Sequence, residues 1–227
     1  MRMTLSAALL LGGVSACGAS VPAGGLVVVE LFQSQGCSSC PPADVILNGL
    51  ADRPDVIALN FSVTYWDYLG WKDSFAQSAF TERQRDYAAN GRGQVATPQM
   101  VLNGRAAVVG NRKAEVDAAI AQIGGIAGGP AIGVAGNVVE IGSGSAATPA
   151  TLWLVRYDPR AIAVPIRGGE NGGRTIVHKN IVRQLVPLGS WRGRPLRFSL
   201  PQAGAGLRSA VFLQAGRGGA IVAARRI

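Results

Sequence analysis

The stretch "QSQGCSSCPPADV", residues 33–45, decides how the rest of the chain is interpreted. Cys37 and Cys40 are separated by two residues and are followed by two prolines and a run that is typical of a helix. Such a pair serves as a redox centre, as half of a metal site or as a structural staple.

Ring size and ligand supply distinguish these three uses. A disulfide across two intervening residues closes a very small ring and therefore stabilises a fold only weakly. A zinc site would need further ligands, and the single histidine, His178, lies far away in the sequence. The pair therefore favours thiol redox chemistry, with no metal and no cofactor other than a redox-active Cys37–Cys40 disulfide.

The segments around the cysteine pair predict a thioredoxin-like order of elements. A continuous apolar run ends at residue 33 and is typical of a buried parallel strand, and a helix follows the cysteines. Later elements are expected at 55–63 (a strand parallel to the first), 73–90 (a helix), 97–110 (a hairpin turning at Asn103–Gly104) and 111–125 (a helix). We expect a βαβαββα α/β domain over residues 26–125.

The second half of the chain has a different pattern. After the glycine-rich joint at 124–130, turns recur every ten residues or so between short alternating runs. The expected strands lie within 131–141, 151–157, 161–166, 175–188, 195–200, 208–214 and 220–226. This spacing predicts a separate, mainly antiparallel, sandwich-like β domain over residues 130–227.

The first residues indicate export. Residues 1–23 contain one arginine and an apolar run of about ten residues, which is typical of a signal peptide. Val14–Cys17 resembles a bacterial lipobox, in which the cysteine is lipidated, whereas ordinary cleavage after Val21–Ala23 would also suit the small residues there. We expect a periplasmic protein or a membrane-anchored lipoprotein that faces the periplasm, an oxidising compartment.

The two cysteines have different expected roles. Cys37, at the start of the helix, is predicted to be the nucleophile, because unsatisfied N–H groups there favour the thiolate. Cys40, one turn further on and less exposed, is predicted to resolve the mixed disulfide. In a thioredoxin-like fold a cis-proline faces this site, so we expect a cis bond at Thr97–Pro98, with Thr97 contacting substrate.

Two further stretches are candidates for binding. Trp66 and Trp71 belong to an aromatic cluster that forms either a lid packed on the fold or an apolar rim for a peptide substrate. The polar stretch at 167–180 is either a glycine-rich hairpin with internal ion pairs and an outward-facing histidine, or a site that faces the cysteines. In the second case His178 becomes a proton partner for Cys37. The candidate residues of this second site are Arg167, Glu170, Asn171, Arg174 and His178.

Charge is divided unevenly along the chain. Residues 1–126 hold 9 basic and 10 acidic groups (net −1), whereas residues 127–227 hold 13 basic and 3 acidic groups (net +10). Of the 22 basic residues 19 are arginine, beside abundant alanine and glycine, which indicates genome composition more than a selected patch. We expect protein or small-thiol substrates, contact with a membrane surface through lipidated Cys17 and the basic second half, and no nucleic acid.

Several motifs together resemble a known family. These are "ELFQSQGCSSCPPAD", the stretch from Tyr65 to Trp71, "TPQMVLNG" and "IRGGENGGRTIVHKNIVR". In order and spacing they are similar to the bacterial exported family catalogued as domain of unknown function 1223. The resemblance implies a thioredoxin-like domain and no established activity.

From the residues, we predict an exported thiol–disulfide oxidoreductase. Two alternatives stay open at this point. The first is a non-catalytic binding module whose disulfide never cycles. The second is a copper-handling protein that adds His178 or Met100 to the two thiolates.

Overall fold

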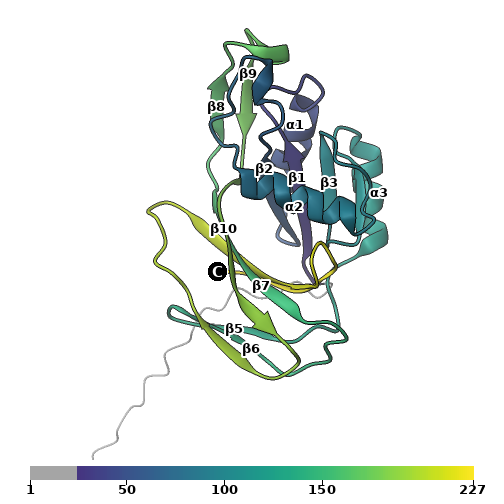
Figure 1. Ribbon diagram of the computed structural model, residues 1–227, viewed down its shortest axis with the longest axis vertical. Helices are drawn as coiled ribbons and strands as arrows, with labels where there is room; N and C mark the ends of the chain where they lie inside the picture. Colours follow the sequence, from purple (N-terminus) through teal and green to yellow (C-terminus); the bar gives the residue numbers. More distant parts are fainter. Residues whose placement is uncertain (1–24) are drawn as a thin grey trace, which may run out of the picture.

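The computed structural model describes residues 25–227, so the predicted signal peptide at 1–23 and the lipobox at Cys17 lie outside the described residues. Three α-helices and thirteen strands occur in this range. Figure 1 shows the helices gathered in the upper half of the view, whereas the lower half consists of strands. None of the helices in residues 25–227 combines the length and apolar character that crossing a bilayer requires.

One mixed sheet of eight strands forms the centre of the molecule, in the order β13-β12-β7-β10-β2-β1-β3-β4. A three-stranded sheet, β11-β6-β5, and a β8-β9 hairpin accompany it. The helices are α1 (Pro41–Leu50), α2 (Ser78–Ala89) and α3 (Lys113–Ile123). The strands are β1 (Val27–Gln33), β2 (Val56–Ser62), β3 (Gln99–Leu102), β4 (Ala106–Val109), β5 (Ile132–Ala135), β6 (Val138–Ile141), β7 (Ala150–Asp158), β8 (Ile162–Pro165), β9 (Thr175–His178), β10 (Ile181–Trp191), β11 (Leu196–Ser199), β12 (Arg208–Ala215) and β13 (Ile221–Arg226).

The expected fold class, a thioredoxin-like βαβαββα domain followed by a separate sandwich-like β domain, is wrong. Strands β1 to β4 and strands β7, β10, β12 and β13 belong to the same sheet, which makes the molecule mainly β. Alternating sequence patterns indicate that a strand buries one face, but they do not say which sheet it joins. The second half therefore resembles a self-contained domain in sequence, although four of its nine strands extend the first sheet.

Both faces of the central strands are covered, which explains their continuous apolar sequences. Every residue of β1 and β2 is buried, and β1 and β2 are parallel, as expected. On one face, Val29 and Leu31 pack with Leu47 of α1 and Ile120 of α3. The opposite face packs against α2 and against strands β7, β10 and β12, so a single core spans the two halves of the chain.

Strands β9 and β10 were expected as one run at 175–188, but the chain turns between them. Asn180 adopts a left-handed backbone (φ 52°), a conformation that asparagine tolerates better than most residues. Its carbonyl accepts a hydrogen bond from the amide of Asn60 at 3.0 Å, and its side chain donates to the carbonyl of Ala58 at 2.9 Å. β10 consequently enters the main sheet parallel to β2, with Ile181 opposite Asn60.

The turn at Asn180 leaves β9 outside the main sheet. β9 pairs with β8, and this hairpin lies against α1, where Figure 1 shows it at the top of the molecule. Asn48 of α1 donates to the carbonyl of Val177 at 2.8 Å, and Lys179 pairs with Asp52. The hairpin is therefore held against the helix that begins at Cys40.

A buried ion pair connects the first strand to the second half. Glu30 accepts bonds from Arg83 of α2 at 2.6 and 3.0 Å, and Arg83 also donates to Gln214 of β12 at 3.1 Å. Burial raises the pKa of Tyr87, so its hydroxyl stays protonated and donates to Glu30. All four side chains are at most 5% exposed. Because charges buried this deeply depend on each other, losing one partner is costly.

This network provides a prediction about stability. Glu30→Ala should lower the free energy of unfolding by about 3–5 kcal/mol, because it leaves the Arg83 charge buried and unpaired. Glu82→Ala is the matched control, since Glu82 pairs with Arg85 on the exposed face of α2 and should cost less than about 1 kcal/mol. Urea unfolding of the disulfide-intact proteins measures both. Equal effects of the two substitutions would contradict the role of the network.

Candidate functional site

Cys37 and Cys40 form a disulfide between the end of β1 and the start of α1, with Cα atoms 5.4 Å apart. Cys40 is the N-cap of α1, and prolines occupy the first helical positions, where a missing N–H costs nothing. Ser39 Oγ lies 3.3 Å from Cys37 Sγ. Helix dipole and hydroxyl are both placed to stabilise a thiolate formed at this turn.

Cys37 is less accessible than expected. Both cysteines are 0% exposed, although Ser38 and Ser39 between them face solvent. Trp66 packs on Gly36, the residue before Cys37, since a Cβ atom added to Gly36 would lie 3.4 Å from Trp66 Cβ. The covering groups come from distant parts of the chain, which is why the helix position alone did not reveal the burial.

The second covering group is the loop between β8 and β9, which contains the short 3-10 helix Gly169–Asn171. The side chain of Asn171 is fully buried and donates to the carbonyls of Gln35 at 2.9 Å and Cys37 at 2.8 Å. Glu170 accepts a bond from the amide of Ser38 at 3.0 Å, and this bond lowers the pKa of its exposed carboxyl group. We call these two residues the latch.

Close backbone approach holds the latch loop in place. A Cβ atom on Gly168 would lie 2.7 Å from the carbonyl oxygen of Gly70, so only glycine fits without a shift. Arg174 donates to Asn171 at 2.9 Å, whereas Arg167 is exposed. Glu170 was expected to pair with an arginine if the loop were an ordinary hairpin, and it binds Ser38 instead.

The aromatic and proline candidates also surround the cysteine turn, and Trp71 lies against the latch loop, since a Cβ atom added to Gly169 would lie 3.3 Å from Trp71 Cβ. The Thr97–Pro98 bond is cis, as expected. Phe32 pairs with Gln99, so Pro98 is placed opposite the end of β1. Trp66 donates to Thr97 Oγ1 at 2.8 Å, and Trp71 donates to Gln35 Oε1 at 2.9 Å. Both tryptophans are partly buried and hydrogen-bonded, which favours the packed lid over the open rim.

His178 lies inside the molecule and not on the outer face of its strand. Its side chain is 0% exposed, and its Nδ1 lies 2.9 Å from Asp44 Oδ1. Because a carboxylate can only accept a hydrogen bond, Nδ1 is the donor. Asn60 donates to the same oxygen at 2.8 Å. Among residues 25–227, Asp44 Oδ2 and His178 Nε2 find no hydrogen-bond partner. A buried acid–base pair therefore lies beside α1, one helical turn from Cys40.

Two titrating groups in this region have shifted pKa values. Burial lowers the pKa of His178, but the charge and hydrogen bond of Asp44 and the charge of Asp73 outweigh it, so the pKa is raised. Burial also raises the pKa of Asp73, whose carboxylate accepts bonds from the amides of Gln35 and Phe75. Asp73 therefore connects the segment before α2 to Gln35, two residues before Cys37.

Sequence reasoning missed Asp44, Asn60 and Asp73. Asp44 follows Cys40 by four residues in a helix, and residues at this spacing share a face. That spacing was available in the sequence. The partner His178 was not, because 134 residues separate it from Asp44.

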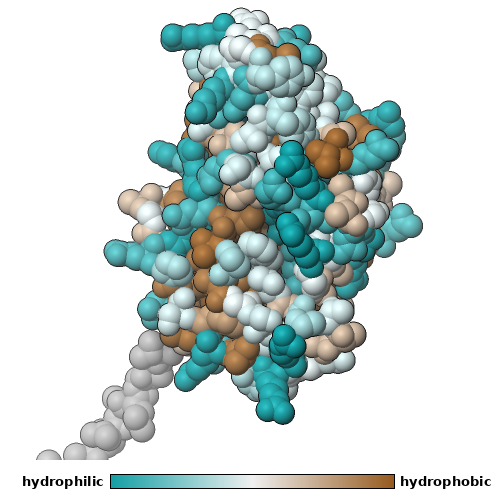
Figure 2. Space-filling view, viewed as in Figure 1, coloured by the Kyte–Doolittle hydropathy of each residue, from teal (hydrophilic) through white to brown (hydrophobic). Residues whose placement is uncertain are grey.

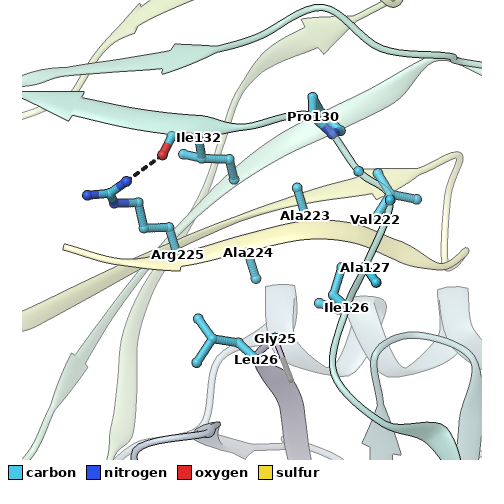
Figure 3. A pocket seen from close by; sticks show the side chains of 12 residues that line it. Gly25, Leu26, Ile126, Ala127, Pro130, Ile132, Val222, Ala223, Ala224 and Arg225 are labelled. Atoms are coloured by element: carbon cyan, nitrogen blue, oxygen red, sulfur yellow. Dashed lines mark hydrogen bonds between the residues drawn. The ribbon is translucent and has the colours of Figure 1, made fainter. Parts of the chain in front are cut away.

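Two other hollows are lined mainly by apolar residues. The cavity in Figure 3, about 160 Å³, lies between β13 and residues 126–132, and its lining is aliphatic except for Arg225, which donates to the carbonyl of Ile132 at 2.7 Å. A hollow of about 360 Å³ borders Pro98 and the edge strand β4. Within residues 25–227, no group of three or more His, Cys, Asp or Glu side chains is arranged to hold a metal ion.

The family described as "Protein of unknown function (DUF1223)" matches residues 28–214. This chain belongs to the DUF1223 family. The disulfide, the latch and the Asp44–His178 pair all lie within the part that matches the family.

Solved structures share the fold. A crystal structure of an Agrobacterium tumefaciens protein is 35% identical, with a TM-score of 0.71, and the match covers 89% of this chain and 94% of that one. HBP35 of Porphyromonas gingivalis has a TM-score of 0.58 over 92% of this chain and 76% of its own, and at 10% identity the likeness concerns the fold alone. No curated protein matches this chain in sequence.

The raised pKa of His178 predicts how stability depends on pH. The folded state holds the His178 proton more tightly than the unfolded state. Its contribution to the free energy of unfolding is therefore complete below about pH 6.5 and is lost as the pH rises through the folded-state pKa of His178. Urea unfolding of the oxidised protein from about pH 5.5 to 9 should show this decline. His178→Gln should lack it, while the lower-pH contribution of Asp73 remains in both proteins. Parallel curves for the two proteins would contradict the assignment.

Proposed function

We propose that this protein is a thiol–disulfide oxidoreductase in which Cys37 attacks and Cys40 resolves. The observation that carries the proposal is the Cys37–Cys40 disulfide at the N-terminus of α1, where the helix favours a thiolate. The ring spans only two intervening residues, so the bond has little value as a brace. The exported location predicted from residues 1–23 belongs to the proposal, since an oxidising compartment maintains such bonds.

The copper-handling alternative fits the site less well. Thiolates and thioethers suit Cu(I), but Met100 is fully buried in the core between the sheet and helices α1 and α3. His178 Nδ1 is bonded to Asp44. One nitrogen of His178 is therefore already engaged, and Met100 belongs to the packed core.

Reaction at Cys37 requires the latch to open. Cys37 is fully buried, and an attacking sulfur must approach it directly. Trp66 and the Gly168–Asn171 loop cover it, and the loop is held through Asn171 and Glu170. The hollow beside Pro98, at the edge strand β4, offers space for an extended segment of a protein substrate.

Cysteine variants test the proposal. Cys40→Ser should accumulate mixed disulfides with partner proteins, because only the second thiol can clear the adduct on Cys37. Cys37→Ser should accumulate almost none. The measurement is non-reducing electrophoresis of thiol-trapped cells, with the double serine variant as the control. The absence of adducts from both single variants would favour the non-catalytic binding module.

The latch provides a separate prediction about rate. Asn171→Ala removes two hydrogen bonds to the turn that holds Cys37, at about 0.5–1.5 kcal/mol per bond, and should therefore speed reduction of the disulfide by dithiothreitol roughly fivefold to 150-fold. Lys179→Ala is the matched control, because Lys179 holds the other end of the hairpin through Asp52. Thermal melts of both variants separate latch opening from unfolding. An unchanged rate for Asn171→Ala would show that reductant reaches the disulfide without movement of the loop.

A further inference from the structure

The buried pair Asp44–His178 joins α1 to β9 through one oxygen of Asp44, and this contact does not account for the other polar atoms of the pair. Asp44 is 1% exposed and His178 is 0% exposed, yet Asp44 Oδ2 and His178 Nε2 both lack a hydrogen-bond partner within the part of the chain that the structure describes. Buried polar atoms are almost always hydrogen-bonded, and exceptions concentrate where a protein uses the group. A purely structural pair in this position would be expected to satisfy both atoms.

The position of Asp44 points to Cys40. Cys40 has a helical backbone as the N-cap of α1 and its carbonyl accepts the amide of Asp44 at 3.1 Å, so the two residues are one turn apart. Residues four apart lie on the same helix face, and side chains in a helix lean toward its N-terminus. Oδ1 is occupied by Asn60 and His178, which leaves Oδ2 as the free oxygen of Asp44.

Carboxyl and aromatic groups surround the imidazole of His178. Asp44 faces His178 from α1, and Asp73 faces it from the segment before α2. The rings of Phe75 and His178 pack edge to face at 5.8 Å between centroids, and the guanidinium of Arg183 of β10 lies over the Phe75 ring, 4.4 Å from its centroid. Two carboxyl groups thus adjoin one imidazole, and the aromatic ring beside it also contacts Arg183.

We propose that Asp44 and His178 store the proton that Cys40 exchanges when the disulfide opens and closes. The inference rests on the proposed oxidoreductase function and adds to it a residue from β9, His178, that acts through Asp44. The thiol of Cys40, and not that of Cys37, is the partner of this pair.

The step balances in both directions. During substrate reduction, a mixed disulfide joins Cys37 to a sulfur of the substrate, and Cys40 gives its proton to the pair. The Cys40 thiolate attacks Cys37 Sγ, the Cys37–Cys40 bond forms, and the bond to the substrate breaks, so the substrate leaves as a thiolate. Two electrons pass from the cysteines to the substrate disulfide. In the reverse direction Cys40 leaves as a thiolate and takes its proton from the pair.

A two-phase reaction with Ellman's reagent, the probe disulfide, tests the inference. The reduced protein should release one thionitrobenzoate as Cys37 attacks and a second as Cys40 closes the disulfide. Asp44→Asn should slow the second phase roughly tenfold to a hundredfold at neutral pH and shift its pH profile, and it should leave the first phase unchanged. His178→Gln should have a smaller effect of the same kind. Asp52→Asn is the matched control, because Asp52 is an exposed carboxylate that also binds the β8-β9 hairpin region, through Lys179.

The outcomes separate the two proposals. A second phase with the same rate and pH profile in Asp44→Asn would overturn the proton-storing role while leaving the oxidoreductase intact. Absence of the second phase in the unsubstituted protein would overturn the oxidoreductase itself.

A measurement without substitutions of Asp44 completes the test. The chain has one histidine, so the imidazole resonances of His178 can be followed alone by NMR. Its titration curve should differ between the disulfide and dithiol forms, and Cys40→Ala should abolish the additional inflection of the dithiol form. Identical curves in the two forms would overturn the inference even if Asp44→Asn did not fold.

Discussion

The arrangement of this protein depends on the two hydrogen bonds that Asn180 makes to β2, one with Asn60 and one with Ala58. Strand β2 is buried on both faces, so its backbone groups must find protein partners. Asn180 supplies a carbonyl to the amide of Asn60 and a side-chain amide to Ala58, and this joins β10 to β2. Through β10, strands β7, β12 and β13 extend the sheet. The side chain of Asn60 meanwhile binds Asp44, so one residue links the sheet to the helix at the disulfide.

The same turn determines what surrounds the cysteines. Because Asn180 redirects the chain, β9 cannot continue into the main sheet and its hairpin packs on α1 instead. This hairpin carries the latch over Cys37 at one end and His178 beside Asp44 at the other. The cysteine turn thus receives part of its cover and its buried imidazole from residues more than 130 positions later.

The basic second half has a structural explanation for several of its arginines. Arg217 pairs with Asp86 of α2, and Arg226 donates to the carbonyl of Pro54 at 2.6 Å. These contacts connect the two halves of the chain. Figure 2 shows hydrophilic side chains distributed over both halves of one face, with hydrophobic residues gathered in a patch in the lower half. The charge excess is therefore partly used within the molecule, and its role toward a membrane stays a prediction.

The sequence by itself determined the features that depend on local patterns. These are the buried parallel strands on either side of α1, the cis bond at Thr97–Pro98, the turn at Asn103–Gly104 and the pairing of Cys37 with Cys40. Family membership also followed from the order of its motifs. Each of these is encoded by residues close together in the chain.

Only the tertiary structure decided the rest. It placed β10 beside β2, buried Cys37 under Asn171 and brought His178 to Asp44. An alternating run shows that a strand has a buried face, but the partner that covers this face is selected by packing and by the need to satisfy buried polar groups. The fold class was mistaken for the same reason, since the runs from 150 to 226 are equally compatible with a separate sandwich and with the extension of an existing sheet.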